Sequence, residues 1–294
     1  MTEYVASKAT DARRPDRRSM ARALVGAALA LGLALTMAGW RSAASRWIGA
    51  PRHVGAAEPG HVVIGESQMG QPLMVYQLGG GPTPVFILGG HHGGPEANTV
   101  RLVYQLMDFF ERYLWEIPQG LRLDFMPEGN PDGLARGSRQ YRSGVDPNRN
   151  WGGPGWEADA YDSNGVFRVG LGGSEPYSEP ETQALRDYLL AVRPALTINY
   201  HSRGGFLFGG RGERSATLSE AYARASGYYR PTPTAGGSAP RLLTYRVSGA
   251  MNPWMADQGL AAILVELATS TDSELARNLA GLQAVLAMLG LDAG

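Results

Sequence analysis

The chain has 294 residues, 44% of them hydrophobic, and its 27 basic and 27 acidic side chains give a formal net charge of zero. This length and composition predict one large α/β domain with an appendage, and the lack of a basic excess argues against a nucleic-acid partner. Cysteine is absent, which excludes a thiol nucleophile, a cysteine-ligated zinc and disulfide bonds. A histidine site must draw on the five histidines of the chain, which are His53, His61, His91, His92 and His201.

The N-terminal part of the chain has the pattern of a membrane-targeting segment. Residues 1–22 are polar and rich in arginine, and residues 23–40 form an uncharged run of 18 residues, which is just long enough to cross a bilayer as a helix. The flanking arginines favour an N-terminus that stays in the cytoplasm. A cleaved signal peptide is the alternative, because small residues follow the run at 42–44.

We therefore predict four parts of the chain. These are a cytoplasmic arginine-rich tail (1–22), a transmembrane anchor or signal segment (23–40), a tether (41–60) and one folded domain (61–294). The folded domain would be anchored outside the cytoplasm, or secreted or periplasmic if the apolar segment is cleaved. The short tether leaves no room for a pro-domain, so we expect no zymogen, and we expect a monomer.

From residue 61 onward, short apolar runs alternate with helical patterns, which is typical of an α/β layer fold. The predicted strands cover residues 84–90, 121–126, 195–200 and 261–265. The predicted helices cover residues 98–114 and 272–289, and a third runs from a capping box at 178–181 toward residue 193. The glycine-rich stretches 152–173 and 206–237 are predicted to be surface loops.

Three of the predicted strands lead directly into histidine or glutamate. The first is followed by His91 and His92, the third by His201, and the fourth by Glu266. Ligands of open α/β sheets bind beyond the carboxyl ends of the strands, so we expect these side chains to share one site. A catalytic zinc takes three nitrogen or oxygen ligands and keeps an open position for water. His92, Glu96 and His201 could supply those three ligands.

Four ordered motifs resemble the M14 zinc metallocarboxypeptidases, over about residues 64–280. They are Gly129-Asn130-Pro131-Asp132-Gly133, Gly144-Val145-Asp146-Pro147-Asn148-Arg149-Asn150-Trp151, Asn199-Tyr200-His201-Ser202 and Val265-Glu266-Leu267. The resemblance implies a zinc carboxypeptidase-like α/β fold, with a mixed, mostly parallel central sheet and helices on both faces. It also implies one Zn²⁺ per chain and the hydrolysis of peptides.

The first zinc-binding segment departs from the usual pattern of the family. The common spacing is His-x-x-Glu, whereas three residues separate His92 from Glu96, as in a bacterial subgroup with a His-Gly-Gly-aromatic-Glu segment. We expect the turn at residues 93–94 to absorb the extra residue. His91 is the alternative ligand, but its gap to Glu96 is longer still, so we favour His92.

The resemblance also implies roles for other residues. Glu266 would be the general base that takes a proton from the attacking water and returns it to the leaving amine. Arg139 aligns with the oxyanion-stabilising arginine of the family, and Arg142 is the alternative. Asn148 and Arg149 match the pair that grips the terminal carboxylate of the substrate, a task suited to the planar guanidinium group.

Two further residues are expected to shape the substrate pocket. Tyr245 matches the mobile tyrosine that caps the substrate, and Asn252 falls at the base of the specificity pocket. A neutral polar floor suits neither a purely apolar side chain nor a strong cation. Specificity for a polar terminal residue is therefore a hypothesis.

The sequence predicts a zinc carboxypeptidase that removes C-terminal residues from peptides outside the cytoplasm. The alternative is a peptidoglycan stem-peptide peptidase or amidase with the same mechanism, because an exported enzyme meets that polymer first. An inactive binding module is a third interpretation, but such a protein would be expected to have lost Glu266 or a metal ligand. A serine hydrolase would need a Gly-x-Ser-x-Gly elbow after a strand, which the sequence lacks.

Overall fold

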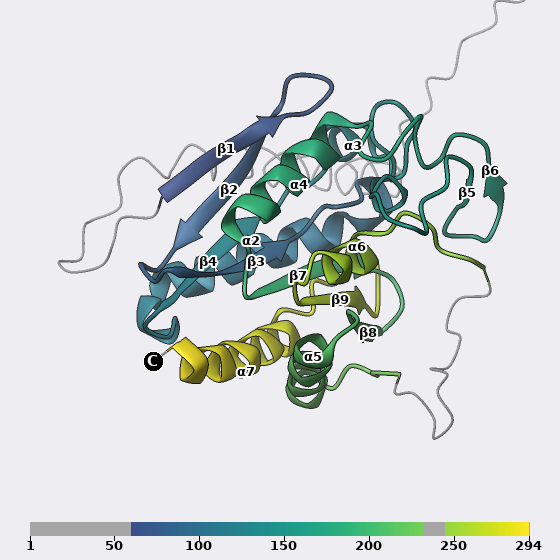
Figure 1. Cartoon of the computed structure of the whole chain (residues 1–294). Coiled ribbons are helices and arrows are strands. Elements are labelled where there is room, and N and C mark those ends of the chain that lie inside the picture. The colour runs from purple at the N-terminus through teal and green to yellow at the C-terminus, as the bar shows by residue number, and fades with distance from the viewer. Residues whose placement is uncertain (1–59, 232–244, 294) are drawn as a thin grey trace, which may run out of the picture. The chain divides into compact units, whose positions relative to one another are not determined.

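A seven-stranded mixed sheet forms the centre of the fold (Figure 1). The computed structural model describes residues 60–231 and 245–293, which belong to one unit, residues 56–294. The strands are β1 (Gly60–Glu66), β2 (Pro72–Leu78), β3 (Thr83–Leu88), β4 (Leu121–Met126), β7 (Leu196–Ser202), β8 (Phe206–Gly209) and β9 (Ala262–Leu267), in the spatial order β1-β2-β4-β3-β7-β9-β8. A separate two-stranded ribbon consists of β5 (Ala160–Tyr161) and β6 (Phe167–Arg168).

Six α-helices and three short 3-10 helices accompany the sheet in the described residues. The α-helices are α2 (Ala97–Arg112), α3 (Pro131–Arg136), α4 (Pro180–Val192), α5 (Glu213–Ser226), α6 (Met251–Asp257) and α7 (Leu275–Ala293). The 3-10 helices are η1 (Gly94–Glu96), η2 (Leu114–Glu116) and η3 (Pro147–Arg149). Helices α4 and α6 pack on one face of the sheet, and α2, α5 and α7 on the other (Figure 1).

The four central strands β4, β3, β7 and β9 run parallel to one another. The outer pairs β1–β2, β2–β4 and β8–β9 are antiparallel. The parallel centre brings the carboxyl ends of β3, β7 and β9 to one edge of the sheet, where α/β folds bind ligands. The predicted α/β fold, with a mixed, mostly parallel sheet between helices, is confirmed.

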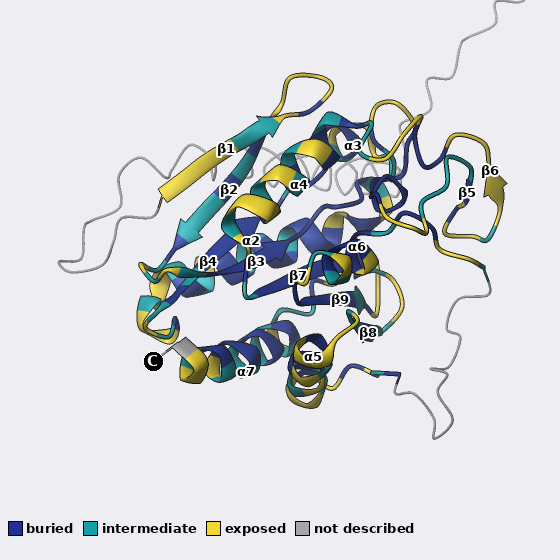
Figure 2. Ribbon diagram, viewed as in Figure 1, coloured by how far each residue is buried: buried dark blue, intermediate teal, exposed yellow. Residues whose placement is uncertain are grey.

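Side chains point alternately to the two faces of the sheet along the central strands, so buried side chains cover both faces. Phe86 and Leu88 of β3 belong to one buried cluster with Leu189 of α4. Val85, which alternates with them, is fully buried on the other face. Figure 2 shows the central strands mostly buried, whereas α4 and α5 carry an exposed outer stripe. A strand buried on both faces reads in sequence as a continuous apolar run, which made β3 easy to predict.

The structure corrects two details of the predicted elements. The stretch 206–237 was predicted to be a loop, but it contains strand β8 and the 14-residue helix α5. The predicted capping box at 178–181 is also wrong, because Glu179 is the N-cap residue of α4 and its side chain makes no capping hydrogen bond. Instead, Glu181 accepts a hydrogen bond of 3.0 Å from the backbone N–H of Gln68, which ties α4 to the β1–β2 connection.

No helix in residues 60–231 and 245–293 is long and apolar enough to cross a membrane. The predicted tail, the predicted anchor or signal segment and residues 41–59 of the predicted tether lie outside the described residues. The first described element is β1, which begins at Gly60.

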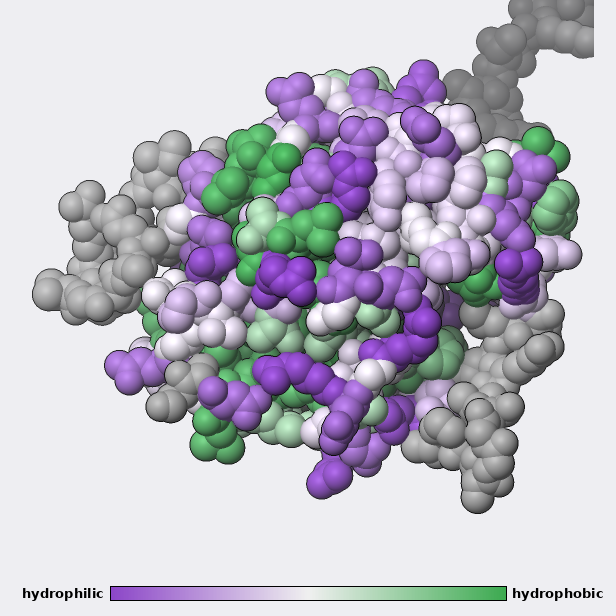
Figure 3. All heavy atoms as spheres, in the orientation of Figure 1, coloured by the Kyte–Doolittle hydropathy of each residue, from purple (hydrophilic) through white to green (hydrophobic). Residues whose placement is uncertain are grey.

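Two valines of the same sheet allow a matched test of the core. Val85 is 0% exposed in a central strand, whereas Val63 is 53% exposed in β1, over which hydrophobic side chains gather on the surface (Figure 3). Val85→Ala is expected to lower the free energy of unfolding by about 2 kcal/mol, because it removes two buried methyl groups and leaves a cavity. Val63→Ala should change it by less than about 0.5 kcal/mol. Urea unfolding followed by circular dichroism measures both, and equal losses would contradict the assigned burial.

Candidate metal centre and substrate cavity

A tight glycine turn after β3 brings His92 and Glu96 together. Gly94 has a φ of +58°, in the left-handed region that favours glycine. A Cβ atom at Gly93 would collide with the backbone of Gly133, and one at Gly94 with the backbone of Gly137. The turn continues as η1, which ends at Glu96. The extra residue between His92 and Glu96 is thus accommodated within one glycine turn, as expected.

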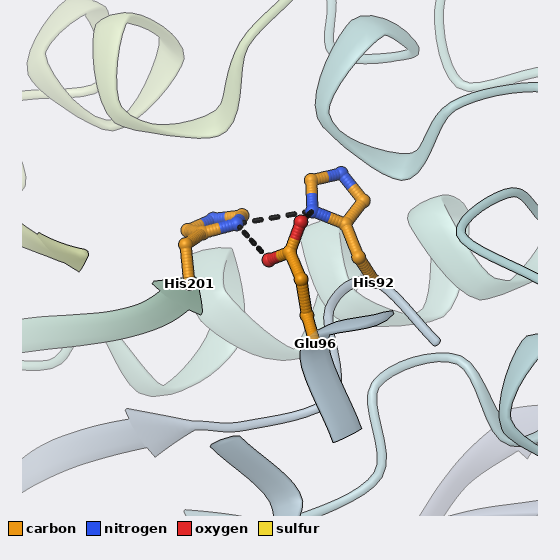
Figure 4. Close-up of side chains that lie close together, drawn as sticks. All are labelled: His92, Glu96 and His201. Carbon is orange, nitrogen blue, oxygen red and sulfur yellow. Dashed lines mark hydrogen bonds and ion pairs between the residues drawn. The ribbon is translucent and has the colours of Figure 1, made fainter. Parts of the chain in front are cut away.

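The three predicted ligands His92, Glu96 and His201 converge on one point (Figure 4). His92 Nδ1 lies 3.0 Å from Glu96 Oε1, and His201 Nδ1 lies 3.1 Å from Glu96 Oε2. The two Nδ1 atoms of His92 and His201 are themselves 3.0 Å apart. All three side chains are buried. His201 comes from the end of β7, so residues more than a hundred positions apart meet here.

This cluster fits a catalytic zinc ion. The three ligand atoms all lie within 4.8 Å of one another, and two imidazole nitrogens with one carboxylate oxygen are a donor set that catalytic zinc takes. Burial lowers the pKa of His201, which favours the neutral imidazole that binds metals. Burial opposes ionisation of Glu96, but His92 and Arg139 hold the pKa of this carboxyl group well below its usual range. A cation at the point of convergence would contact all three ligand atoms.

Asp146 contacts His92 on the side of the ring that faces away from the cluster. Its Oδ1 lies 2.8 Å from His92 Nε2, the ring nitrogen that faces away from the cluster. Such a carboxylate fixes the tautomer and orientation of a metal-binding imidazole. Asp146 Oδ2 accepts a hydrogen bond of 2.9 Å from Arg139 Nε, and Arg139 Nη1 also contacts Glu96. We did not predict a role for Asp146, although it lies inside the second of the four recognised motifs.

His91 does not join the metal cluster. Its ring stacks on that of His92, with the ring centroids 5.4 Å apart, and its Nδ1 lies 3.1 Å from Asn199 Nδ2. Burial, together with the neighbouring His92, holds the pKa of His91 well below its usual value. Of the two adjacent histidines, His92 lies in the cluster with Glu96 and His201, and His91 lies outside it.

A cavity of about 380 Å³ opens beside the cluster. All six remaining predicted site residues line it together with His201, and they are Arg139, Asn148, Arg149, Tyr245, Asn252 and Glu266. Glu266 of β9 pairs in register with His201 of β7, which sets the predicted base directly beside a predicted ligand. Arg142, the alternative to Arg139, is exposed and does not line the cavity.

Arg149 brings a buried positive charge to the cavity. It is 3% exposed, and it donates hydrogen bonds to backbone carbonyls, from Nε to Tyr161 at 3.0 Å and from Nη1 to Asn148 at 2.8 Å. Within the part of the chain that the structure describes, it makes no ion pair. Asn148 is held in turn, because its Oδ1 accepts a hydrogen bond of 2.9 Å from the backbone of Met251. A buried guanidinium group without a counterion suits the binding of a carboxylate.

Glu266 has the titration behaviour expected of a general base. Burial, reinforced by the negative charge of Glu96, raises the pKa of Glu266 to about 7, although Arg139 opposes this shift. A base whose pKa lies near the working pH transfers protons most effectively.

Asn252 differs from the other residues that line the cavity, because neither polar atom of its buried side chain has a hydrogen-bond partner in the described residues.

Comparisons with known proteins agree with this geometry. The sequence profile of the zinc carboxypeptidase family, peptidase M14, matches residues 56–278. The chain is 29% identical over 232 residues to murein peptide amidase A of Escherichia coli (strain K12), an alignment that covers 75% of this chain and 86% of that protein. The crystal structure of a murein-tripeptide amidase from Escherichia coli O157 is similar at a TM-score of 0.59 and 25% identity, covering 82% of this chain and 96% of that one.

A carboxypeptidase A from Helicoverpa armigera shares the fold at a TM-score of 0.60 and 19% identity, over 80% of this chain and 68% of that one. The matched residues 56–278 make up more than half of the 294-residue chain and include the whole His92, Glu96 and His201 cluster and Glu266. The chain therefore belongs to the zinc carboxypeptidase family, peptidase M14, and is a zinc metallopeptidase.

Proposed function

We propose that this enzyme removes the C-terminal residue from peptides that carry a free terminal carboxylate. The observation that supports this most directly is Arg149, a buried cation without a counterion, in the same cavity as Glu266 and the metal cluster. A cation at that place favours the end of a chain over its middle, because the C-terminus is the part of the backbone that carries a carboxylate.

Zinc would be held by His92, Glu96 and His201, and when bound it supplies Lewis-acid polarisation of the carbonyl and lowers the pKa of water. Glu266 accepts the proton of the attacking water and delivers it to the leaving amine, as its pKa near 7 allows. Arg139 presents its guanidinium group to the cavity and stabilises the oxygen that gains negative charge during the attack.

The remaining lining residues would position the substrate. Arg149 and Asn148 would bind the terminal carboxylate, and Tyr245, which also lines the cavity, would cover the bound residue. Asn252 lines the same cavity and would contact the side chain of the terminal residue.

A second candidate substrate is a murein peptide, for which the enzyme would act as a peptidase or amidase. This candidate is favoured by the similarity to murein peptide amidase A, which extends over 86% of that protein. The two candidates share every residue role given above and differ in the substrate alone.

We also propose that the domain acts outside the cytoplasm, attached through residues 23–40 or released after their cleavage. The apolar run and its flanking arginines support this localisation.

The purified protein is expected to bind one zinc ion per chain, and His201→Ala to lose most of it, because two ligands remain of three. Metal content after dialysis, measured by mass spectrometry, tests this. His61→Ala is the matched control, because His61 is an exposed residue of β1. Full zinc content in His201→Ala would remove His201 from the ligand set.

Exopeptidase action requires the free carboxylate of the substrate. A blocked dipeptide with a free C-terminus is therefore expected to be hydrolysed at least about 100-fold faster, as kcat/KM, than its C-terminal amide. Arg149→Gln should remove most of this preference, because it deletes the cation that distinguishes the two substrates. Equal rates on both substrates in the wild-type enzyme would contradict a carboxypeptidase.

Glu266→Gln is expected to keep zinc but to lower kcat by about 10² to 10⁴-fold, because the amide cannot accept a proton. In the wild-type enzyme, kcat/KM should fall as the pH drops through the pKa of Glu266 and the carboxylate becomes protonated. The value of about 7 applies to the site without a bound cation. A bound cation favours the carboxylate form of Glu266 and so lowers its pKa. The midpoint of the acidic limb should therefore lie at or below about 7, and a limb well above 7 would assign it to another group.

A further inference from the structure

Arg211 lines the cavity beside its floor residue, Asn252. Its Nη2 donates a hydrogen bond of 3.2 Å to the carbonyl oxygen of Pro253, the residue directly after Asn252. The same nitrogen contacts the carboxylate of Asp257. Both bonds use Nη2, so Nε and Nη1 of Arg211 have no hydrogen-bond partner among the described residues. The side chain of Arg211 is 68% exposed, so its guanidinium group lies at the open rim of the cavity, held through one nitrogen and with donors left for a ligand.

The wall between Glu266 and Arg211 is apolar. β8 runs antiparallel to β9, with Phe206 opposite Glu266 and Phe208 opposite Leu264. Phe206, Phe208 and Leu264 line the cavity. Arg211 follows two residues after the end of β8, and each strand residue advances the chain by about 3.4 Å. The backbone of Arg211 therefore lies farther along this wall than that of Phe206, which pairs with Glu266.

The charges around the cavity are unevenly distributed. Glu266 is the one acidic side chain among the lining residues, against three arginines, Arg139, Arg149 and Arg211. Arg139 is compensated by Glu96 and Asp146. The arginines that remain for a ligand are Arg149, which has no ion pair in the described residues, and Arg211, which is partly compensated by Asp257.

We propose that the cavity selects a dicarboxylic C-terminal residue, with Arg211 as the determinant of specificity. This inference rests on the proposed function. The α-carboxylate binds Arg149, the aliphatic part of the side chain packs against Phe208 and Leu264, and the second carboxylate binds the free donors of Arg211. The buried amide of Asn252, which lacks a partner, donates a further hydrogen bond to the side chain.

The length of the wall indicates a side chain of several methylene groups rather than that of aspartate. The test therefore uses blocked dipeptides that are identical except for the last residue, which is 2-aminoadipate, norleucine or lysine. The first two have side chains of the same chain length and differ in the terminal carboxylate. We expect kcat/KM to be highest for 2-aminoadipate, by about tenfold or more over norleucine, because charge-assisted hydrogen bonds to arginine are strong.

Arg211→Gln should reduce the ratio of kcat/KM for 2-aminoadipate over norleucine by about tenfold, through KM more than kcat, because the lost contact is made equally in the ground and transition states. Arg214→Gln is the matched control. Arg214 lies in α5, pairs with Asp292 at 3.5 Å and does not line the cavity, so this substitution should leave the ratio unchanged. A preference for norleucine or lysine in the wild type, or an unchanged ratio in Arg211→Gln, would overturn the inference.

Calorimetric binding separates this inference from the proposed function. The same peptides are titrated into the zinc-loaded Glu266→Gln protein, with and without Arg211→Gln. Tighter binding of the 2-aminoadipate peptide that is lost with Arg211→Gln supports the inference even if no peptide is hydrolysed by the wild type, which would refute the proposed function alone. Equal affinities with observed hydrolysis refute the inference alone, and equal affinities without hydrolysis refute both.

Discussion

The register between strands β7 and β9 determines the rest of the site. It sets His201 directly opposite Glu266, so that a metal ligand and the proposed base stand on neighbouring strands at the same height. Side chains alternate along a strand, and a slip of one residue would turn one of them to the opposite face of the sheet. The next strand, β8, continues the arrangement, because Phe206 pairs with Glu266 and begins the cavity wall.

A second constraint is the buried chain of charges behind the metal ligands. Asp146 contacts both His92 and Arg139, and Arg139 also contacts Glu96. Buried charges are costly unless each is paired and hydrogen-bonded. Here the pairing serves two purposes, since the same contacts orient a metal ligand and fix the arginine that faces the substrate. Removing one member would leave a buried charge without its partner and disturb both functions.

Much of this site could be predicted from local sequence. His92 and Glu96 follow the apolar run of β3, and His201 and Glu266 lie in recognisable motifs. Strand β4 was predicted with its observed bounds. His201 and Glu266 fall inside their strands rather than after them, which is an error of the size usual for strand boundaries.

Other features depend on contacts that local sequence does not encode. Strand β8 and helix α5 were hidden by the glycines around them, because their stability comes from packing against β9 and α7. The capping box failed because the carboxylate of Glu181 bonds the backbone of Gln68 instead. Arg211 follows a glycine pair in an irregular segment, and only the folded arrangement brings it beside Asn252.

The glycine turn of the metal loop also couples the metal cluster to a segment that contributes none of its three side chains. Gly93 and Gly94 lie so close to the backbone at residues 133–138 that no side chain fits between the two segments. The separation of His92 and Glu96 therefore depends on how the segment containing α3 packs against the loop. A substitution that shifts this packing would move the two side chains apart without touching either of them.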